Sequence, residues 1–359
     1  MIREMITKVV KGNDLTDLET EQVMEEIMTG EATPAQIGAF VTALRIKGET
    51  IDEITGAARV MRAKATRIQL NNHLVNIDRD EINIETETIL DTCGTGGDGT
   101  RTFNVSTTTA FVAAGAGVRV AKHGNRAVSS QCGSADVLQS LGVNLDLNAS
   151  DVERCIREVG IGFLYAPLFH GAMKHAAGPR REIGIRTLFN LLGPLTNPAG
   201  ATAQVLGVYD PALTEKMAHV LNRLGTKEAY VVCGEGTFDE LSICGSTRIS
   251  HLKDGRVNTF DVTPEDYGLR RATPQEIEGG NARRNAQIVR HVLEGKRGPK
   301  RDMVLLNAAA AFVVTGLDQD MKAGVARGAH VIDAGLALDK LDRLVAFTQE
   351  CAPLQLRAM

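Results

Sequence analysis

The chain of 359 residues carries 40 Lys and Arg against 44 Asp and Glu, which gives a net charge of -4 at pH 7. This balance offers no attractive field for a polyanion. Only 4% of the residues are aromatic and Trp is absent, which leaves few platforms for base stacking. We therefore expect no nucleic-acid partner. The length suits one large domain with an accessory domain, or two domains.

The cysteine pattern and the N-terminal residues predict a cytoplasmic protein. The six cysteines form no C-x-x-C pair and have no His at zinc-finger spacing, so we expect reduced thiols. Cys132 and His123 could in principle form a Cys-His nucleophile, but a local signature is missing and a packing thiol is favoured. The first residues contain no signal-peptide core. The longest apolar run, residues 304–317, is too short for a bilayer and predicts a buried helix, so we expect no membrane partner.

Residues 1 to about 71 show apolar positions at helical spacing. We predict short amphipathic helices with Thr20, Thr33 and Thr50 as N-terminal caps, and with Gly30 and Gly48 ending the first and second of them. These helices hold no cluster of titratable residues suited to chemistry, so residues 1–74 are interpreted as a scaffold or subunit-contact domain. Residues 71–87 are polar and acidic with weak strand character, and we predict a linker there.

The stretch from residue 89 to residue 136 is the strongest candidate for a functional site. An apolar run, residues 89–93, ends in Gly94-Thr95-Gly96-Gly97-Asp98-Gly99, whose backbone N–H groups can close on a bulky anion such as phosphate. Residues 104–109 are rich in hydroxyls and predict the capped start of a helix whose positive end faces the same loop. A third polar loop follows at residues 122–130, and Ser134 lies just beyond it.

Two other phosphate-binding motifs fit this stretch less well. Gly94, Gly96 and Gly99 satisfy G-x-G-x-x-G, but a dinucleotide site also needs an acidic residue after the next strand, where this chain has Lys122. A Walker loop is excluded because no Gly-Lys-Ser/Thr follows. Asp98 would repel a bare pyrophosphate unless a divalent cation or a sugar hydroxyl lay between them. A phosphorylated sugar with a metal fits best, because a structural glycine turn explains neither Asp98 nor the neighbouring polar loops.

Beyond this stretch, strand and helix patterns alternate. The fold class predicted is α/β: a small all-helical N-terminal domain plus a larger α/β domain, residues 75–359, with a mostly parallel central sheet flanked by helices. A hairpin is expected at Asp254-Gly255, with His251 as an ordinary strand residue. Strands are predicted at 141–145, 161–165, 204–208 and 229–233, and helices at 149–159 (capped by Ser150-Asp151), 211–224, 281–293, 303–315 and 338–350.

Charged and polar residues outside the three loops add further candidates. Arg186 lies among apolar residues, where a guanidinium is costly unless it meets a carboxylate or a phosphate. Asp239 and Glu240 follow a predicted strand and could both turn toward one hard cation, although adjacent acids on a loop usually have no such role. Asn307 is either a satisfied core amide or a group near the cleft, and the sequence leaves both possibilities open.

Together these motifs resemble the anthranilate phosphoribosyltransferase family. The matching segments are the glycine loop at 94–99, residues 104–107, residues 122–130, residues 184–198, the Asp239-Glu240-Leu241-Ser242 loop and the Ala-rich stretch 307–316. The resemblance covers most of the chain. It departs from the family pattern at Arg101, at Gln131-Cys132 and in the longer polar stretch 71–87, and these departures concern local contacts more than activity.

The resemblance implies a magnesium-dependent transferase of tryptophan biosynthesis, which moves the 5-phosphoribosyl group of PRPP onto the amine of anthranilate and releases pyrophosphate. It also implies a homodimer, a segment at about 176–198 that folds back onto the N-terminal helices, and no obligatory general base. The anthranilate contacts it implies are Gly94, Asn125 and Arg186, and the metal ligands are Ser106, Asp239 and Glu240. The implied PRPP contacts are Gly94, Gly97, Asp98, Thr102, Asn104, Val105, Ser106, Thr107, Lys122, His123, Gly124, Asn125, Arg126, Ala127, Val128, Ser129, Ser130 and Ser134.

Two other functions are weighed against this one. A pyrimidine nucleoside phosphorylase would share the architecture in outline, but it would need phosphate and a nucleoside, and its Lys-Met-Ser-Gly-type loop is not in the sequence. A non-catalytic nucleic-acid-binding relative is disfavoured by the acidic balance and by the missing basic stripe.

Overall fold

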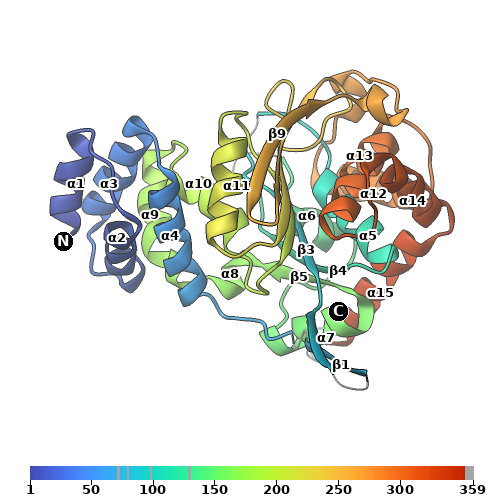
Figure 1. Ribbon diagram of the computed structural model, residues 1–359, viewed down its shortest axis with the longest axis horizontal. Helices are drawn as coiled ribbons and strands as arrows, with labels where there is room; N and C mark the ends of the chain where they lie inside the picture. The colour runs from blue at the N-terminus through green and yellow to red at the C-terminus, as the bar shows by residue number, and fades with distance from the viewer. Residues whose placement is uncertain (71–72, 79–80, 98, 128–130, 352–359) are drawn as a thin grey trace.

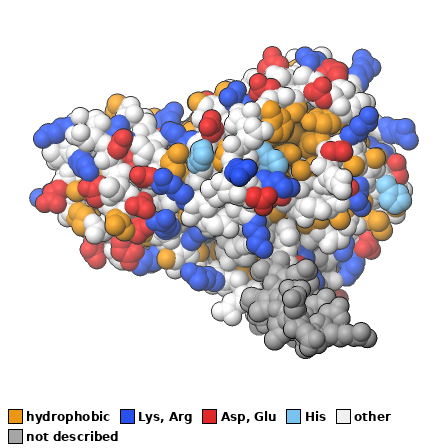
Figure 2. All heavy atoms as spheres, viewed as in Figure 1, with side chains coloured by type: hydrophobic (Ala, Val, Ile, Leu, Met, Phe, Trp, Pro, Cys, Tyr) orange, Lys and Arg blue, Asp and Glu red, His pale blue; other side chains and the backbone are white. Residues whose placement is uncertain are grey.

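The computed structural model describes residues 1–70, 73–78, 81–97, 99–127 and 131–351. Helices α1 (Ile2–Val10), α2 (Asp17–Thr29), α3 (Pro34–Lys47) and α4 (Ile51–Lys64) pack together at one end of the molecule (Figure 1). Acidic and basic side chains are interspersed over this helical end (Figure 2). None of the helices in the described ranges is long and apolar enough to cross a membrane.

The helix boundaries follow local capping chemistry. Thr33 and Thr50 cap α3 and α4 as predicted, and Gly30 ends α2 in the left-handed conformation. The predicted cap at Thr20 is wrong, because Thr16 caps α2 and forms a reciprocal capping box with Glu19. The hydroxyl of Thr20 instead donates back to the Thr16 carbonyl. Helix α1 was not predicted.

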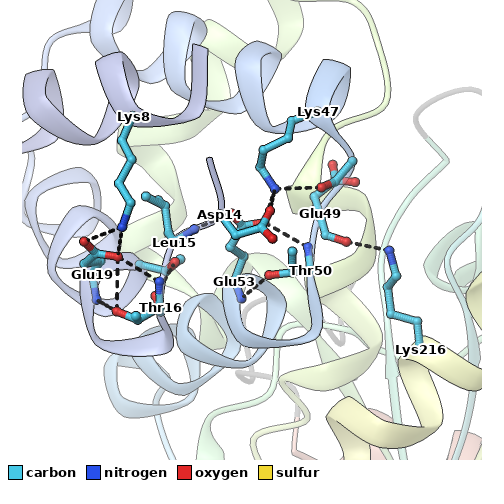
Figure 3. A network of polar contacts seen from close by, with 12 residues as sticks. Lys8, Asp14, Leu15, Thr16, Glu19, Lys47, Glu49, Thr50, Glu53 and Lys216 are labelled. Atoms are coloured by element: carbon cyan, nitrogen blue, oxygen red, sulfur yellow. Dashed lines mark hydrogen bonds and ion pairs between the residues drawn. The ribbon is translucent and has the colours of Figure 1, made fainter. Parts of the chain in front are cut away.

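A buried carboxylate ties the turns of this helical end together (Figure 3). Glu53 is fully buried and accepts hydrogen bonds from the backbone N–H groups of Leu15 (2.9 Å) and Thr50 (2.8 Å). Lys47 donates to the same carboxylate at 3.0 Å and to Asp14 at 2.7 Å. A buried charge is costly unless it is paired and hydrogen-bonded, and Glu53 meets both conditions. It therefore holds the turn before α2 against the turn before α4.

In the described part of the chain the main sheet has seven strands in the order β5-β4-β3-β6-β7-β8-β9. Pairing is parallel from β5 to β7, whereas β8 and β9 form the antiparallel edge, with the hairpin at Asp254-Gly255 as predicted. The mostly parallel sheet is thus confirmed. The strands are β3 (Ile89–Gly94), β4 (Arg119–Gly124), β5 (Ile161–Tyr165), β6 (Ala203–Gly207), β7 (Glu228–Gly234), β8 (Thr247–Lys253) and β9 (Arg256–Val262).

Helices cover both faces of this sheet (Figure 1). One face packs on a core that includes α5, α6 and the C-terminal helices, with α13 buried at almost every position as its apolar sequence predicted. The other face shares a single apolar cluster with α1–α4 and α9–α11. The helices beyond α4 are α5 (Val105–Gly115), α6 (Ser134–Ser140), α7 (Ala149–Val159), α8 (Ala166–Phe169), α9 (Lys174–Ile183), α10 (Leu188–Leu192), α11 (Leu213–Arg223), α12 (Ala282–Leu293), α13 (Pro299–Val314), α14 (Met321–Asp333) and α15 (Leu336–Glu350).

The helical end is joined to the sheet by polar contacts as well as by apolar packing. Helix α9 packs on α2 and α3, and α10 packs on α4. Arg62 on α4 donates to the carbonyl oxygens of Leu195 (2.6 Å) and Leu224 (2.9 Å), and burial lowers the pKa of its guanidinium to about 10. Lys216 on α11 donates to the carbonyl of Glu49 (Figure 3). These contacts hold the two parts of the chain in one arrangement.

Some predicted elements are wrong. The predicted strand at 141–145 is irregular, because the backbone N–H of Asn144 donates to the Thr348 hydroxyl and not to a neighbouring strand. Helix α7 is capped by Asn148, whose side chain accepts from Asp151 N, and not by Ser150-Asp151. In place of the linker predicted at 71–87, β1 (His73–Asp78) and β2 (Glu81–Thr86) form a separate antiparallel pair. Helix α14 was not predicted.

Candidate functional site

The predicted site loops meet at the carboxyl edge of the parallel strands. The glycine loop follows β3 at Gly94, the third polar loop follows β4 at Gly124, and the carboxylate loop 235–242 follows β7 at Gly234. Strand β6 lies between β3 and β7 and ends opposite β3, with Gly207 paired to Gly94. Ligand sites of open parallel sheets form at this edge, so the sequence placed these loops correctly.

The glycine loop needs its glycines for conformation. Gly96 and Gly97 have φ values of +66° and +69°, in the left-handed region that other residues rarely adopt. Gly96 N donates to Asp239 Oδ2 at 2.8 Å, so the loop is already tied to the carboxylate loop. A Cβ on Gly97 would lie 3.2 Å from Arg186 Nε. Asp98 lies outside the described residues.

The start of α5 forms the second part of the site. Asn104 is the N-cap residue, but the predicted side-chain cap is wrong, because its side chain donates to Cys132 O (3.3 Å) and accepts from Asn285 Nδ2 (2.9 Å). Because no side chain caps α5, the backbone N–H groups of its first turn can bind other acceptors. One of them, Ser106 N, donates to Glu240 Oε1 at 3.2 Å. In the described structure the buried Thr107 hydroxyl has no hydrogen-bond partner. Val105 is fully buried within this turn.

Lys122 brings a positive charge to the same corner. Its side chain is 3% exposed, and Nζ donates to Thr92 O and lies 3.5 Å from Ser106 Oγ. Asp91, fully buried on β3, has a raised pKa because of desolvation, which the charge of Lys122 opposes. An ammonium held beside the start of α5 suits a phosphorylated ligand.

The third polar loop is organised by Asp136 on α6. Its carboxylate accepts from Ala127 N and Gly133 N, each at 2.9 Å, and pairs with Arg126 at 3.0 Å. Burial pushes the pKa of Asp136 up, but these hydrogen bonds hold it below its usual value. Ser134 Oγ lies 3.3 Å from Asn125 O. Val128, Ser129 and Ser130 lie outside the described residues.

His123 does not pair with Cys132 in the way a nucleophilic dyad requires. His123 Nδ1 lies 3.2 Å from Gly193 O, and its Nε2 lies 3.2 Å from His170 Nε2. Burial lowers the pKa of His123 to about 3 and that of His170 to about 4, so both rings are neutral at pH 7. The Cys132 thiol lies beside Asn104 Oδ1, and burial raises its pKa to about 11. The packing role favoured from the sequence therefore fits Cys132.

The two loop carboxylates point toward the other parts of the site. Asp239 Oδ2 accepts from Gly96 N, and Glu240 Oε1 accepts from Ser106 N. Two carboxylates near a serine hydroxyl provide the hard oxygen donors that Mg²⁺ prefers. Within the described ranges no group of three His, Cys, Asp or Glu residues could hold a metal on its own. The donor set thus fits a magnesium ion that takes further ligands from a substrate and from water.

Arg186 is the prediction that the structure changes most. The expected burial is wrong, since Arg186 is exposed, with its guanidinium 4.4 Å from the Tyr209 ring centroid and Nε facing the backbone of Gly97. Arg180 on α9 meets the burial criterion better. Desolvation lowers its pKa, and its guanidinium stacks over Phe189 at 5.1 Å. Sequence reasoning missed Arg180 because α9 is polar overall.

Thr102 and Arg101 lie at the rim of the site. Thr102 forms an isolated β-bridge with Glu278, and its hydroxyl lies 3.3 Å from Thr100 Oγ1. Arg101, one of the departures from the family pattern, has a side chain that is 76% exposed and lies 3.9 Å from Glu278. The extra guanidinium is therefore largely exposed to solvent and lies beside Glu278.

Comparison with known proteins gives a consistent result. The glycosyl transferase family a/b domain matches residues 86–338, and the helical bundle domain of the same family matches residues 3–65. The anthranilate phosphoribosyltransferase of Geotalea uraniireducens is 59% identical over 350 residues, which cover 98% of this chain and 100% of that protein. The chain belongs to the anthranilate phosphoribosyltransferase family. The enzyme of Geobacter sulfurreducens is 57% identical over 98% of this chain and 100% of its own length.

Solved structures of the family share the fold. Anthranilate phosphoribosyltransferase from Thermus thermophilus superposes with a TM-score of 0.87 at 42% identity and covers 96% of this chain and 99% of its own. The Saccharomyces cerevisiae enzyme in complex with PRPP and Mg has a TM-score of 0.86 at 28% identity, covering 97% and 98%. The family, the fold class and the transferase function predicted from the sequence are confirmed, and magnesium is confirmed as a metal of the family.

Proposed function

We propose that this chain transfers the 5-phosphoribosyl group of PRPP to the amine of anthranilate and releases pyrophosphate, a step of tryptophan biosynthesis, with Mg²⁺ as cofactor. The proposal rests mainly on the contacts that join the carboxylate loop to the glycine loop and to the start of α5. Asp239 contacts the glycine loop through Gly96, and Glu240 contacts the start of α5 through Ser106. The carboxylates, the open helix start and Lys122 together suit a diphosphate bound with a metal.

The chemistry requires positioning more than covalent help. Carbon 1 of the ribose becomes oxocarbenium-like as pyrophosphate leaves, so the protein must stabilise charge on the leaving group and align the amine. Backbone N–H groups of the glycine loop and of α5, together with Lys122, provide positive potential for that charge. When bound, Mg²⁺ neutralises diphosphate charge as a Lewis acid. His123, with its pKa lowered to about 3, is a poor proton acceptor at pH 7, which agrees with the prediction that no general base is required.

We assign the PRPP contacts to the loops whose side chains the sequence singled out, and the metal ligands to Ser106, Asp239 and Glu240. The described PRPP residues come from the glycine loop, the start of α5 and the third polar loop. They are Gly94, Gly97, Thr102, Asn104, Val105, Ser106, Thr107, Lys122, His123, Gly124, Asn125, Arg126, Ala127 and Ser134, and we propose Asp98, Val128, Ser129 and Ser130 from the sequence alone.

Anthranilate would bind through Gly94, Asn125 and a guanidinium that pairs with its carboxylate. Arg186 is the proposed guanidinium, and its exposed position beside Gly97 leaves it open to a ligand. Arg180 is the structural alternative, because its desolvated guanidinium has no ion-pair partner among the described residues. The two assignments predict different mutant phenotypes.

We further propose a homodimer, a cytoplasmic location and a domain division near residue 74, with residues at about 176–198 joined to the helical domain. The helical end exposes Val10 (70%), Leu18 (64%) and Ile46 (82%), which supports subunit contact there. Six free cysteines agree with a reducing compartment. Sedimentation of the purified protein tests the dimer.

The direct test is an assay with PRPP, Mg²⁺ and anthranilate, followed by the loss of anthranilate fluorescence. The fluorescence should fall only when all three are present, and pyrophosphate should appear in equal amount. A pyrimidine nucleoside with inorganic phosphate is the matched test of the phosphorylase alternative. Phosphorolysis without consumption of anthranilate would reject the proposal.

A further inference from the structure

The carboxylate loop is seated on glycines at the ends of neighbouring strands. A Cβ on Gly207, at the end of β6, would lie 1.5 Å from Asp239 O. A Cβ on Gly94, at the end of β3, would lie 2.3 Å from Asp239 Oδ2, and one on Gly234, at the end of β7, would lie 2.6 Å from Ser242 Cβ. The carboxylate loop therefore packs directly against the strand ends, and adding a single methyl group at one of these glycines would displace it.

A single buried amide holds this loop from the opposite side. Asn307 on α13 is 1% exposed. Its Oδ1 accepts from Leu241 N at 3.1 Å, and its Nδ2 donates to Leu241 O and to Met303 O, each at 2.9 Å. The side chain thus pairs with both backbone groups of Leu241, as a neighbouring strand would. The residue immediately before Leu241 is Glu240, one of the three proposed metal ligands.

A buried amide at Asn307 would reduce stability if its polar atoms were unpaired. Its neighbours on α13 are Ala, Leu, Phe and Val side chains that are almost all fully buried. An amide in such surroundings is tolerated only when its polar atoms are paired, and an apolar residue of similar volume would pack without that requirement. Both meanings that the sequence left open for Asn307 therefore apply, since it is a satisfied core amide and also contacts the carboxylate loop.

We propose that Asn307 is a positioning residue for the metal site. By clamping both backbone groups of Leu241, it fixes the peptide that carries Glu240 and keeps Asp239 and Glu240 turned toward the glycine loop and α5. The inference rests on the proposed metal site but not on the identity of the acceptor. Without the clamp, the N–H and carbonyl groups of Leu241 are buried without partners, and the loop must move to solvate them.

The test measures metal affinity directly. Asn307→Leu removes the amide at similar volume, and Mn²⁺ serves as the probe, titrated in the presence of pyrophosphate and followed by electron paramagnetic resonance. We expect Mn²⁺ affinity to fall about 10-fold, the lower end of the range for groups that support metal ligands. In turnover, half-saturation by Mg²⁺ should rise while the KM for anthranilate stays unchanged. A purely structural role would alter both substrates alike.

A matched control comes from another buried asparagine. Asn285 on α12 is 2% exposed and holds Asn104, not the carboxylate loop. Asn285→Leu should cost similar stability and weaken PRPP use, and its loss of Mn²⁺ affinity should be clearly smaller than that of Asn307→Leu. Equal losses of Mn²⁺ affinity in the Asn285 and Asn307 variants would overturn the inference.

Two further measurements cover the case in which Asn307→Leu does not fold. Gly207→Ala pushes on Asp239 O from the strand side and leaves Asn307 in place, so it should also weaken Mn²⁺ binding. In the wild-type protein, the Leu241 amide should be strongly protected from hydrogen exchange without any ligand. An exposed Leu241 amide, or unchanged Mn²⁺ affinity in a folded variant, contradicts the proposal. Because no Mn²⁺ measurement involves anthranilate, failure of the proposed acceptor would leave this result standing.

Discussion

The identity of the guanidinium that meets anthranilate can be decided with paired variants, Arg186→Ala and Arg180→Ala. If Arg186 binds the carboxylate, its removal should raise the KM for anthranilate and leave the KM for PRPP nearly unchanged. Loss of a charge-assisted hydrogen bond costs about 1.5–3 kcal/mol, which corresponds to an increase in KM of about 10- to 150-fold. Arg186→Lys keeps the charge without the planar fork and should give an intermediate value.

The stability cost of the Arg186 change is expected to be small. Arg186 is exposed and stacks on Tyr209 at 4.4 Å, an interaction worth about 0.5–1 kcal/mol at such a site. For a chain of this length the Tm should therefore fall by only about 1–2 °C. Arg180 is more deeply placed and packs over Phe189, so its removal should lower the Tm further.

The assay combines both KM values with an acceptor that has no carboxylate. Aniline retains the amine but has no carboxylate, so the wild-type enzyme should use it poorly. The variant that has lost the guanidinium for the carboxylate should use aniline no worse than the wild type does. A selective anthranilate defect in Arg180→Ala, with Arg186→Ala normal, transfers the role to Arg180. Parallel loss of PRPP affinity and Tm in Arg186→Ala would refute the substrate role and indicate a support for the glycine loop at Gly97.

Three further predictions concern charge. Replacing Asp239 and Glu240 together by Ala should lower magnesium-dependent kcat/KM for PRPP by about 100-fold without lowering the Tm, and unchanged turnover across a magnesium titration would contradict the assignment. Burial lowers the pKa of His170 from 6.5 to about 4 in the folded state, so the stability that the neutral ring provides above pH 6.5 is lost as the pH falls. Between pH 7 and pH 4.5 the free energy of unfolding, measured in urea, should fall by about 2 kcal/mol more for the wild type than for His170→Asn. Equal losses would exclude a neutral buried ring. Glu53→Gln should destabilise by about 3 kcal/mol, because it breaks a buried ion pair. The capping-box variant Glu19→Gln, at a partly exposed carboxylate, should cost less than about 1 kcal/mol. Equal costs would show that burial of Glu53 is not the cause.

The sequence predicted well the features that depend on nearby residues. The glycine loop, the parallel strands and the hairpin at Asp254-Gly255 follow from strand periodicity and turn residues within a few positions. Errors arose where a local signal was overlooked or outweighed. Thr16 with Glu19 forms the capping box that should have been preferred over Thr20. The strand expected at 141–145 has buried Val143 and Leu145, but its backbone bonds a distant threonine hydroxyl and has no neighbouring strand.

Burial of a single charged residue was the harder question. Residues 188–192 are almost all buried on α10, yet Arg186 precedes that helix in an exposed turn, so the apolar neighbours do not enclose it. Arg180 lies in a polar helix and is nevertheless desolvated by packing over Phe189. Whether a side chain is buried depends on the surface its element meets, which an apolar neighbour in sequence does not specify.

The contacts of the residues that hold the site in place could not be predicted from local pattern, because these residues lie far along the chain from the groups they bind. Asn285 is 181 positions from Asn104, and Asn307 is 66 positions from Leu241. Each belongs to a helix predicted to cover the sheet, and for Asn307 the sequence left open a core amide or a group near the cleft. A sequence motif can reveal the glycine loop, whereas the alignment of the site also depends on amide side chains of α12 and α13. A substitution at either asparagine, although it looks like a change in the core, should therefore alter ligand binding before it alters the fold.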